Sequence, residues 1–127
     1  VKQAAFAAAH AGLVASGTVT LEMAAGGTPQ VAAYKAAPVT AFIARRLLKI
    51  DTANLVNLAT GRRAVPEFYQ ETCTPEALAE AVAPLLDGGE AREMQAEAAR
   101  AAMAALGGGG EPPSTRAARS VLAALAR

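Results

Sequence analysis

The sequence predicts an α/β domain in which a short parallel sheet is covered by helices, with further helices towards the carboxyl end. Apolar runs of strand length alternate with segments of helical periodicity, and glycine or proline residues separate them. Alanine supplies 35 of the 127 residues and aromatic residues only 4%, which is typical of helices that pack closely through small side chains. The length allows one domain.

The expected strands and helices follow a regular order. Three apolar runs have strand length: residues 13–15, 30–34 and 53–58. Six segments are expected to be helical: residues 2–10, 19–25, 38–50, 75–86, 90–106 and 114–127. The alternation predicts a parallel sheet, because parallel strands need a long crossover connection. Three strands are too few for a doubly wound sheet to stand alone, so we expect the second half of a larger Rossmann-like domain.

Glycine, proline and hydroxyl side chains set the expected boundaries in the first half of the chain. Gly12 stops the first helix, and Thr18 is the expected N-cap of the second. Pro29 comes just before the second strand, where a missing N–H removes little from the ladder. Pro38 suits the first turn of the third helix.

The second half of the chain carries similar signals. Gly61 ends the third apolar run, and residues 66–70 are expected to form a loop or a single helical turn. Thr74 and Pro75 supply an N-cap and a first-turn proline for the next helix. Ser114 is the expected N-cap of the last helix.

Charge is segregated along the chain although the net charge is only +1. Residues 23–66 sum to +5 and residues 67–111 to −7. A basic block suits a phosphate, a nucleotide or a lipid surface, but charge alone favours an ordinary solvated face. The predicted helix over residues 38–50 contains three cations: Arg45, Arg46 and Lys49. Two interpretations of this helix are open: it covers the sheet, or it lies on anionic lipid. Its apolar residues favour the first.

Composition excludes several classes of protein. The single cysteine, Cys73, excludes an internal disulfide framework, and the single histidine, His10, excludes a histidine-based metal site within one chain. No uncharged run reaches the roughly 18 residues of a membrane span, and the first residues lack the features of a signal peptide. Basic and aromatic residues are not interleaved. We therefore expect no nucleic-acid partner, no metal and no cofactor.

A strand, a glycine turn and a helix start follow one another at residues 13–22. Gly17 permits a tight turn and a close approach of a ligand, while Ser16 and Thr18 can donate hydrogen bonds. The free N–H groups at the helix start suit a diphosphate, and Glu22, one turn further on, can accept a hydrogen bond from a ribose hydroxyl. The same residues are explained equally well if Thr18 caps the helix and Glu22 complements its dipole.

A second polar stretch follows the third apolar run. Asn57, Glu67 and Gln70 can form fixed hydrogen bonds, and Gly61 and Pro66 fix the backbone between them. If this stretch leaves the carboxyl end of the third strand, it lies beside the glycine turn, where ligands of open α/β sheets bind. A surface loop with capping residues is the alternative.

Two motifs occur in a set order: Ser16-Gly17-Thr18 first and Pro66-Glu67-x-x-Gln70 last, with Tyr34-Lys35 and an Ala-Arg-Arg-Leu element between them. They lie in the runs ASGTVTLEMAAGGTPQVAAYKAAPVTAFIARRLLK and NLATGRRAVPEFYQETCTPEALAEAVAPLL. These runs closely resemble the carboxyl-terminal region of the lipid-A-disaccharide synthases. The resemblance covers about residues 5–87 well and the remaining helices loosely.

The resemblance implies a glycosyltransferase of the GT-B class, whose two Rossmann-like halves enclose the active site. Such enzymes join UDP-2,3-diacylglucosamine to 2,3-diacylglucosamine 1-phosphate with inversion, need no metal, and work on the cytoplasmic side of the inner membrane. The chain would be a single partial domain from the carboxyl-terminal half. Residues 1–87 would form its nucleotide-sugar-binding core and residues 90–127 its additional helices.

The resemblance also implies roles for individual residues. The residues that would hold the diphosphate are Ser16, Gly17 and Thr18. The residue that would hold the ribose is Glu22. Three more would lie near the nucleotide sugar: Asn57, Glu67 and Gln70. The implied partners are the donor, the acceptor held by the amino-terminal half, an anionic membrane surface and a second copy in a homodimer.

Two features depart from the family pattern. Val56 stands before Asn57, where a proline is common, and the amino-terminal half that should carry the catalytic base is absent from the sequence. We therefore expect a fragment without catalytic residues of its own. One alternative is a non-catalytic helical interaction domain, which the alanine-rich helices after Thr74 favour. Another is a different UDP-sugar enzyme, such as an epimerase, which the polar stretch from Asn57 to Gln70 disfavours.

Overall fold

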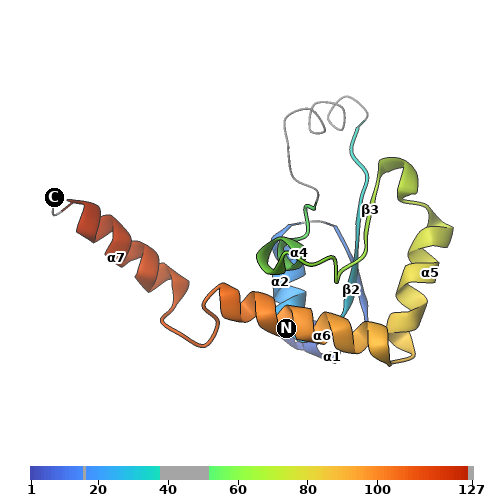
Figure 1. Ribbon diagram of the computed structural model, residues 1–127, viewed down its shortest axis with the longest axis horizontal. Helices are drawn as coiled ribbons and strands as arrows, with labels where there is room; N and C mark the ends of the chain where they lie inside the picture. Colours follow the sequence, from blue (N-terminus) through green and yellow to red (C-terminus); the bar gives the residue numbers. More distant parts are fainter. Residues whose placement is uncertain (16, 38–51, 126–127) are drawn as a thin grey trace.

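The computed structural model describes residues 1–15, 17–37 and 52–125 and shows a mixed α/β fold (Figure 1). A parallel sheet contains β1 (Gly12–Val14), β2 (Gln30–Tyr34) and β3 (Glu67–Tyr69), in that order. The helices are α1 (Lys2–Ala8), α2 (Thr18–Ala25), α4 (Leu55–Thr60), α5 (Pro75–Leu86), α6 (Glu90–Ala105) and α7 (Pro113–Leu125), with the 3-10 turn η1 (Gln70–Thr72). The predicted fold class is confirmed, whereas the helix expected over residues 38–50 lies outside the described residues.

The three strands run in the same direction, so their carboxyl ends lie at one edge of the sheet, towards the top of Figure 1. The register pairs Val14 of β1 with Ala32 of β2, and Ala32 with Glu67 of β3. The turn into α2 leaves β1 at this edge, and η1 leaves β3 there. Ligands of open parallel sheets bind at the carboxyl edge, so this topology directs attention to the residues that follow each strand.

The central strand is covered on both faces. Val31 and Ala32 are consecutive residues of β2 with 0% exposure, and consecutive strand side chains point to opposite faces. One face packs against α2, α4 and α6, and α5 lies on the other side of the strands in Figure 1. The buried apolar residues of α6 are all alanines, namely Ala98, Ala99 and Ala102. Small side chains let this helix approach its neighbours closely.

A buried amide on α6 fixes the start of β2. The Gln30 N–H donates to Gln95 Oε1 at 2.8 Å, and Gln95 Nε2 donates to the Gln30 carbonyl oxygen at 3.0 Å. The Gln95 side chain therefore pairs with the strand backbone much as a neighbouring strand would. Because Gln95 is buried, water cannot readily replace these two hydrogen bonds.

The predicted third strand over residues 53–58 is wrong, because most of this segment belongs to α4. Asn54 caps the helix: its side-chain oxygen accepts hydrogen bonds from the N–H groups of Val56 and Asn57, at 2.9 and 3.2 Å. Gly61 ends the helix in the left-handed conformation, with φ of 65°. A short apolar run can be a buried strand or a helix, and here the two caps decide for the helix.

The third strand is instead β3, at residues 67–69, where the sequence predicts a loop or a single helical turn. The Ala32 N–H donates to the Pro66 carbonyl oxygen at 2.9 Å and opens the pairing with β2. Each residue of β3 is half-buried, so its sequence lacks the alternation of a typical strand. Residues 67–69 therefore form a strand because they pair with the free edge of β2, which is distant in sequence.

Several predicted helix boundaries are confirmed, and two predicted N-caps are wrong. Thr74 accepts a hydrogen bond from a backbone N–H of α5 at 3.3 Å and caps that helix as predicted. The N-cap of α2 is Gly17, because Thr18 is already the first helical residue. Ser114 lies inside the first turn of α7, which begins at Pro113. In both cases the hydroxyl residue that was expected to cap the helix lies inside its first turn.

The carboxyl-terminal helices differ in how they pack. α6 contributes to the core, whereas α7 stands apart from the other elements in Figure 1 and exposes each of its residues. The division of the chain at residues 87–90 stays a prediction. Within the described ranges, no helix is long and apolar enough to cross a membrane.

Gln95→Leu should lower the free energy of unfolding by about 2–4 kcal/mol. The substitution leaves the N–H and carbonyl groups of Gln30 buried without partners, at roughly 1–3 kcal/mol each, and the leucine offsets part of this by burying apolar surface. Urea denaturation measures the change. Glu93→Gln, on the exposed side of the same helix, is the control. Equal stability of the Gln95 and Glu93 variants would contradict this role for the amide.

Candidate functional site

The turn between β1 and α2 lies at the carboxyl edge of the sheet. Gly17 has φ of 125°, which residues with a Cβ rarely adopt. Among the residues that the structure describes, no heavy atom beyond the chain neighbours of Gly17 lies within 4 Å of the position that a Cβ would take there. The backbone of the turn therefore faces open space at the start of a helix, where a ligand can approach it.

Thr20 fixes this turn, although its part was not predicted. Its Oγ1 donates to the Gly17 carbonyl oxygen at 2.7 Å, and its N–H donates to the same oxygen at 3.1 Å. Thr20 is fully buried, whereas Thr18 is exposed at the first position of α2. Ser16 lies outside the described residues. The buried Thr20 thus holds the turn through two hydrogen bonds to Gly17, and the side chain of Thr18 remains exposed.

Glu22 lies on the side of α2 that meets α1. Its Oε2 is 2.5 Å from Lys2 Nζ, and Lys2 Nζ also lies 5.6 Å from the centre of the Phe6 ring. The Lys2 and Glu22 side chains are 60% and 43% exposed, so this ion pair adds little to stability. The predicted contact of Glu22 with a ribose stays a prediction.

Glu67, the first residue of β3, is the centre of a hydrogen-bond network. Five groups of the described chain donate to its carboxylate: the hydroxyls of Thr52 and Tyr69, the side-chain amide of Asn57, and the backbone N–H groups of Ala53 and Asn54. The amide bond is 2.7 Å long, and the two backbone bonds are 3.0 and 3.1 Å. The carboxylate thus ties the segment that enters α4 to the edge of the sheet.

The network shifts the titration of both its acidic groups. Burial raises the pKa of Glu67, but the hydrogen bonds from Thr52, Tyr69 and Asn57 outweigh it, so that the pKa lies below its ordinary value of 4.5. Burial and the hydrogen bond to Glu67 together raise the pKa of Tyr69 to about 12. At neutral pH the network therefore contains a carboxylate and a protonated phenol.

Asn57 is 1% exposed and holds the chain ahead of β3. Besides its bond to Glu67, its Nδ2 donates to the Val65 carbonyl oxygen at 2.8 Å. The Val65 N–H donates to Asn57 Oδ1 at 2.9 Å. The structure thus brings Asn57 and Glu67 into contact, and both ends of the Asn57 amide are engaged within the protein.

Gln70 follows β3 directly and has φ of 50°, the one positive φ at a non-glycine position in the described part of the chain. Its Oε1 accepts a hydrogen bond from the Ala36 N–H at 2.6 Å, and its Nε2 donates to the Ala36 carbonyl oxygen at 3.0 Å. The side chain of Gln70 therefore joins the segment leaving β3 to the segment leaving β2.

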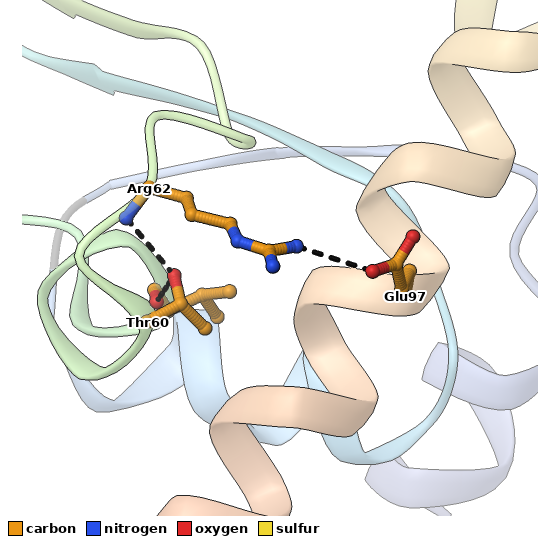
Figure 2. A network of polar contacts seen from close by, with 4 residues as sticks. Thr60, Arg62 and Glu97 are labelled. Atoms are coloured by element: carbon orange, nitrogen blue, oxygen red, sulfur yellow. Dashed lines mark hydrogen bonds and ion pairs between the residues drawn. The ribbon is translucent and has the colours of Figure 1, made fainter.

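A separate network joins the turn after α4 to α6 (Figure 2). Thr60 Oγ1 donates to the Val56 carbonyl oxygen at 2.8 Å and accepts from the Arg62 N–H at 3.3 Å. Arg62 Nη1 lies 3.1 Å from Glu97 Oε1. The charged side chains are largely exposed, so the pair orients the turn more than it stabilises the fold.

The predicted site residues thus fall into separate places. The glycine turn follows β1, and Glu22 pairs with Lys2. Gln70 bonds to the segment after β2, and Asn57 bonds to Glu67 at the start of β3. The residues missed by sequence reasoning are the supporting ones: Thr20, Thr52, Asn54 and Tyr69. Only Asn54 gave a local signal, as a capping residue before an apolar run. No three histidine, cysteine or acidic side chains within the described ranges are placed to hold a metal ion.

Comparison with known proteins gives a consistent result over most of the chain. A family model described as lipid-A-disaccharide synthetase matches residues 1–118. A lipid-A-disaccharide synthase of Bradyrhizobium diazoefficiens is 44% identical over 124 residues, which are 98% of this chain and 32% of that protein. The protein of the same name from Ruegeria pomeroyi is 50% identical over 121 residues, 95% of this chain and 29% of the relative. The chain therefore spans about a third of the length of these curated relatives.

Glu67→Gln should destabilise the fold at neutral pH by about 1–2 kcal/mol, because it places an amide among donors that need an acceptor; partial exposure keeps the effect small. The folded pKa of Glu67 is depressed, so its contribution is present above pH 4.5 and is lost as the pH falls through the folded pKa. The stability difference between wild type and variant should therefore narrow below pH 4.5.

Urea denaturation at neutral pH and at several values below pH 4.5 checks this expectation. Glu80→Gln, at an exposed position of α5, should follow the wild type at each pH. A stability difference between wild type and the Glu67 variant that stays constant as the pH falls would show that the carboxylate charge is not what the network binds.

Proposed function

Because the chain belongs to the lipid-A-disaccharide synthase family, as its motifs predict, we propose that it binds the UDP part of the sugar donor of a glycosyltransferase. The proposed donor is UDP-2,3-diacylglucosamine, and the proposed acceptor is 2,3-diacylglucosamine 1-phosphate, with inversion at the transferred sugar. Since the chain spans about a third of its relatives, our proposal assigns acceptor binding and the catalytic base to residues outside these 127.

The accessible glycine turn at the carboxyl edge of the sheet is the observation that carries this proposal. Gly17 leaves its backbone open at the start of α2, an eight-residue helix. A helix start has unpaired N–H groups and a partial positive charge, and both suit a diphosphate. The exposed Thr18 lies at the same point and can donate a further hydrogen bond.

In this proposal the Glu67 network supports the site from within. Its carboxylate already accepts five hydrogen bonds, and the Asn57 amide is buried and fully used. We therefore assign both residues to fixing the edge of the sheet beside the nucleotide sugar. This is a specific role for two residues that the family resemblance places near the nucleotide sugar.

The proposal extends to the surroundings of the enzyme. It places the whole protein at the cytoplasmic face of the inner membrane, with an anionic membrane surface as one of its partners. It also includes a homodimer, which the exposed apolar side chains of α7 support: Val121, Leu122 and Leu125. A chain that binds no UDP would instead favour the non-catalytic interaction domain.

Glu22→Gln should weaken UDP binding by about 1.5–3 kcal/mol, the range for a hydrogen bond to a charged group, because Glu22 is proposed to accept a ribose hydroxyl. Isothermal titration calorimetry with UDP measures the change. Lys2→Gln is the matched control, since it removes the same ion pair and leaves the carboxylate in place. If both variants bind UDP as the wild type does, Glu22 belongs to the ion pair alone.

The 127-residue chain by itself should bind UDP weakly and transfer no sugar. Inverting transfer needs a base for the acceptor hydroxyl and a cleft that positions both sugars, and the proposal assigns these to other residues. Mass spectrometry of a reaction with donor and acceptor checks this expectation. Transfer should appear when the rest of the enzyme is supplied, covalently or in trans. Disaccharide formed by the chain alone would contradict the assignment of the base.

A further inference from the structure

The carboxyl end of the central strand carries a cation that has no part in the site described so far. Lys35 comes directly after Tyr34, the last residue of β2. It is exposed, and its ammonium group has no ion pair or hydrogen bond with any described residue. Within the described part of the chain, Lys35 is thus an unpaired positive charge at the edge where ligands of parallel sheets bind.

Lys35 and the glycine turn follow two neighbouring strands of the sheet. β1 and β2 pair Val14 with Ala32, and Gly17 and Lys35 each lie three residues further along their chains. Neighbouring strands are about 4.8 Å apart, a distance that a lysine side chain spans. Both therefore lie at the carboxyl edge of the sheet, on strands that are direct neighbours.

The neighbouring strand fixes the backbone at Lys35. The last pair between β2 and β3 is Tyr34 with Tyr69, and Lys35 and Gln70 follow it. The Gln70 amide bonds to both backbone groups of Ala36, at 2.6 and 3.0 Å, and so continues the pairing beyond the last strand residues. The positive φ of Gln70 is unfavourable for a residue with a Cβ and is kept in place by these contacts.

We propose that Lys35 binds the diphosphate of the nucleotide sugar, and that Gln70 is a positioning residue that holds Lys35 at the edge of the sheet. The inference rests on the proposed function and names the charge that this function needs. A helix start offers about half an elementary charge, which is less than a diphosphate carries. The ammonium group of a lysine supplies a full charge. With its amide engaged by Ala36, Gln70 acts through Lys35.

Titration of the chain with UDP and with uridine, followed by NMR chemical shifts, tests this proposal. Lys35→Gln should lower the affinity for UDP about tenfold or more, the effect of losing a hydrogen bond to a charged group. Its affinity for uridine, which has no phosphate, should not change. Lys35→Arg should recover most of the UDP affinity. Arg63→Gln, which removes an exposed cation after α4, is the charge-matched control and should change neither affinity.

A double-mutant cycle tests the role of Gln70. Gln70→Ala should weaken UDP binding in the wild-type background and have no further effect in the Lys35→Gln background. An equal loss in both backgrounds would overturn the positioning role. A wild-type chain that binds no UDP would overturn the proposed function together with this inference. A wild-type chain that binds UDP, with a Lys35→Gln variant that binds it equally well, would overturn the inference alone.

Discussion

A partly buried carboxylate must find enough donors to replace its hydration, and Glu67 meets this requirement by joining three segments of the chain. The donors come from residues 52–54, from the first turns of α4 and from β3 itself. Together they determine where α4 begins, because Asn54, whose N–H donates to Glu67, is also the N-cap of that helix. They also determine where β3 meets β2, and therefore where Gln70 leaves the sheet.

The sheet is held from its other end by a helix that is distant in sequence. Gln95 bonds to the backbone of Gln30, 65 residues earlier, and the alanines of α6 close the core over α2 and α4. Small side chains suit this arrangement, since a core poor in aromatic residues needs close helix contacts to exclude water. The amino ends of the strands are thus fixed by packing against α6.

The sequence predicts an element well where the signal is local and fails where it depends on distant partners. β2 and α5 were predicted because Pro29 and Thr74 mark their starts directly. β3 was not predicted, because it forms only through pairing with β2. The residues of α4 were predicted to be a strand, because apolar content alone does not distinguish a short helix from a short strand. In the site, the glycine turn has a local signature. The supporting roles of Thr20 and Tyr69 follow from register and packing, which no short motif contains.

The position of Glu67 near a diphosphate site needs a physical explanation, because like charges repel. Glu67 pairs with Ala32, three residues before Lys35, which places it about 10 Å down the strand from the proposed phosphate contact. Five internal donors offset the carboxylate charge further, and the depressed pKa of Glu67 records their effect. The network that shapes the edge therefore also weakens the field that would oppose an anionic ligand there. Lys35, which has no ion pair with any described residue, supplies a positive charge three residues further along the neighbouring strand.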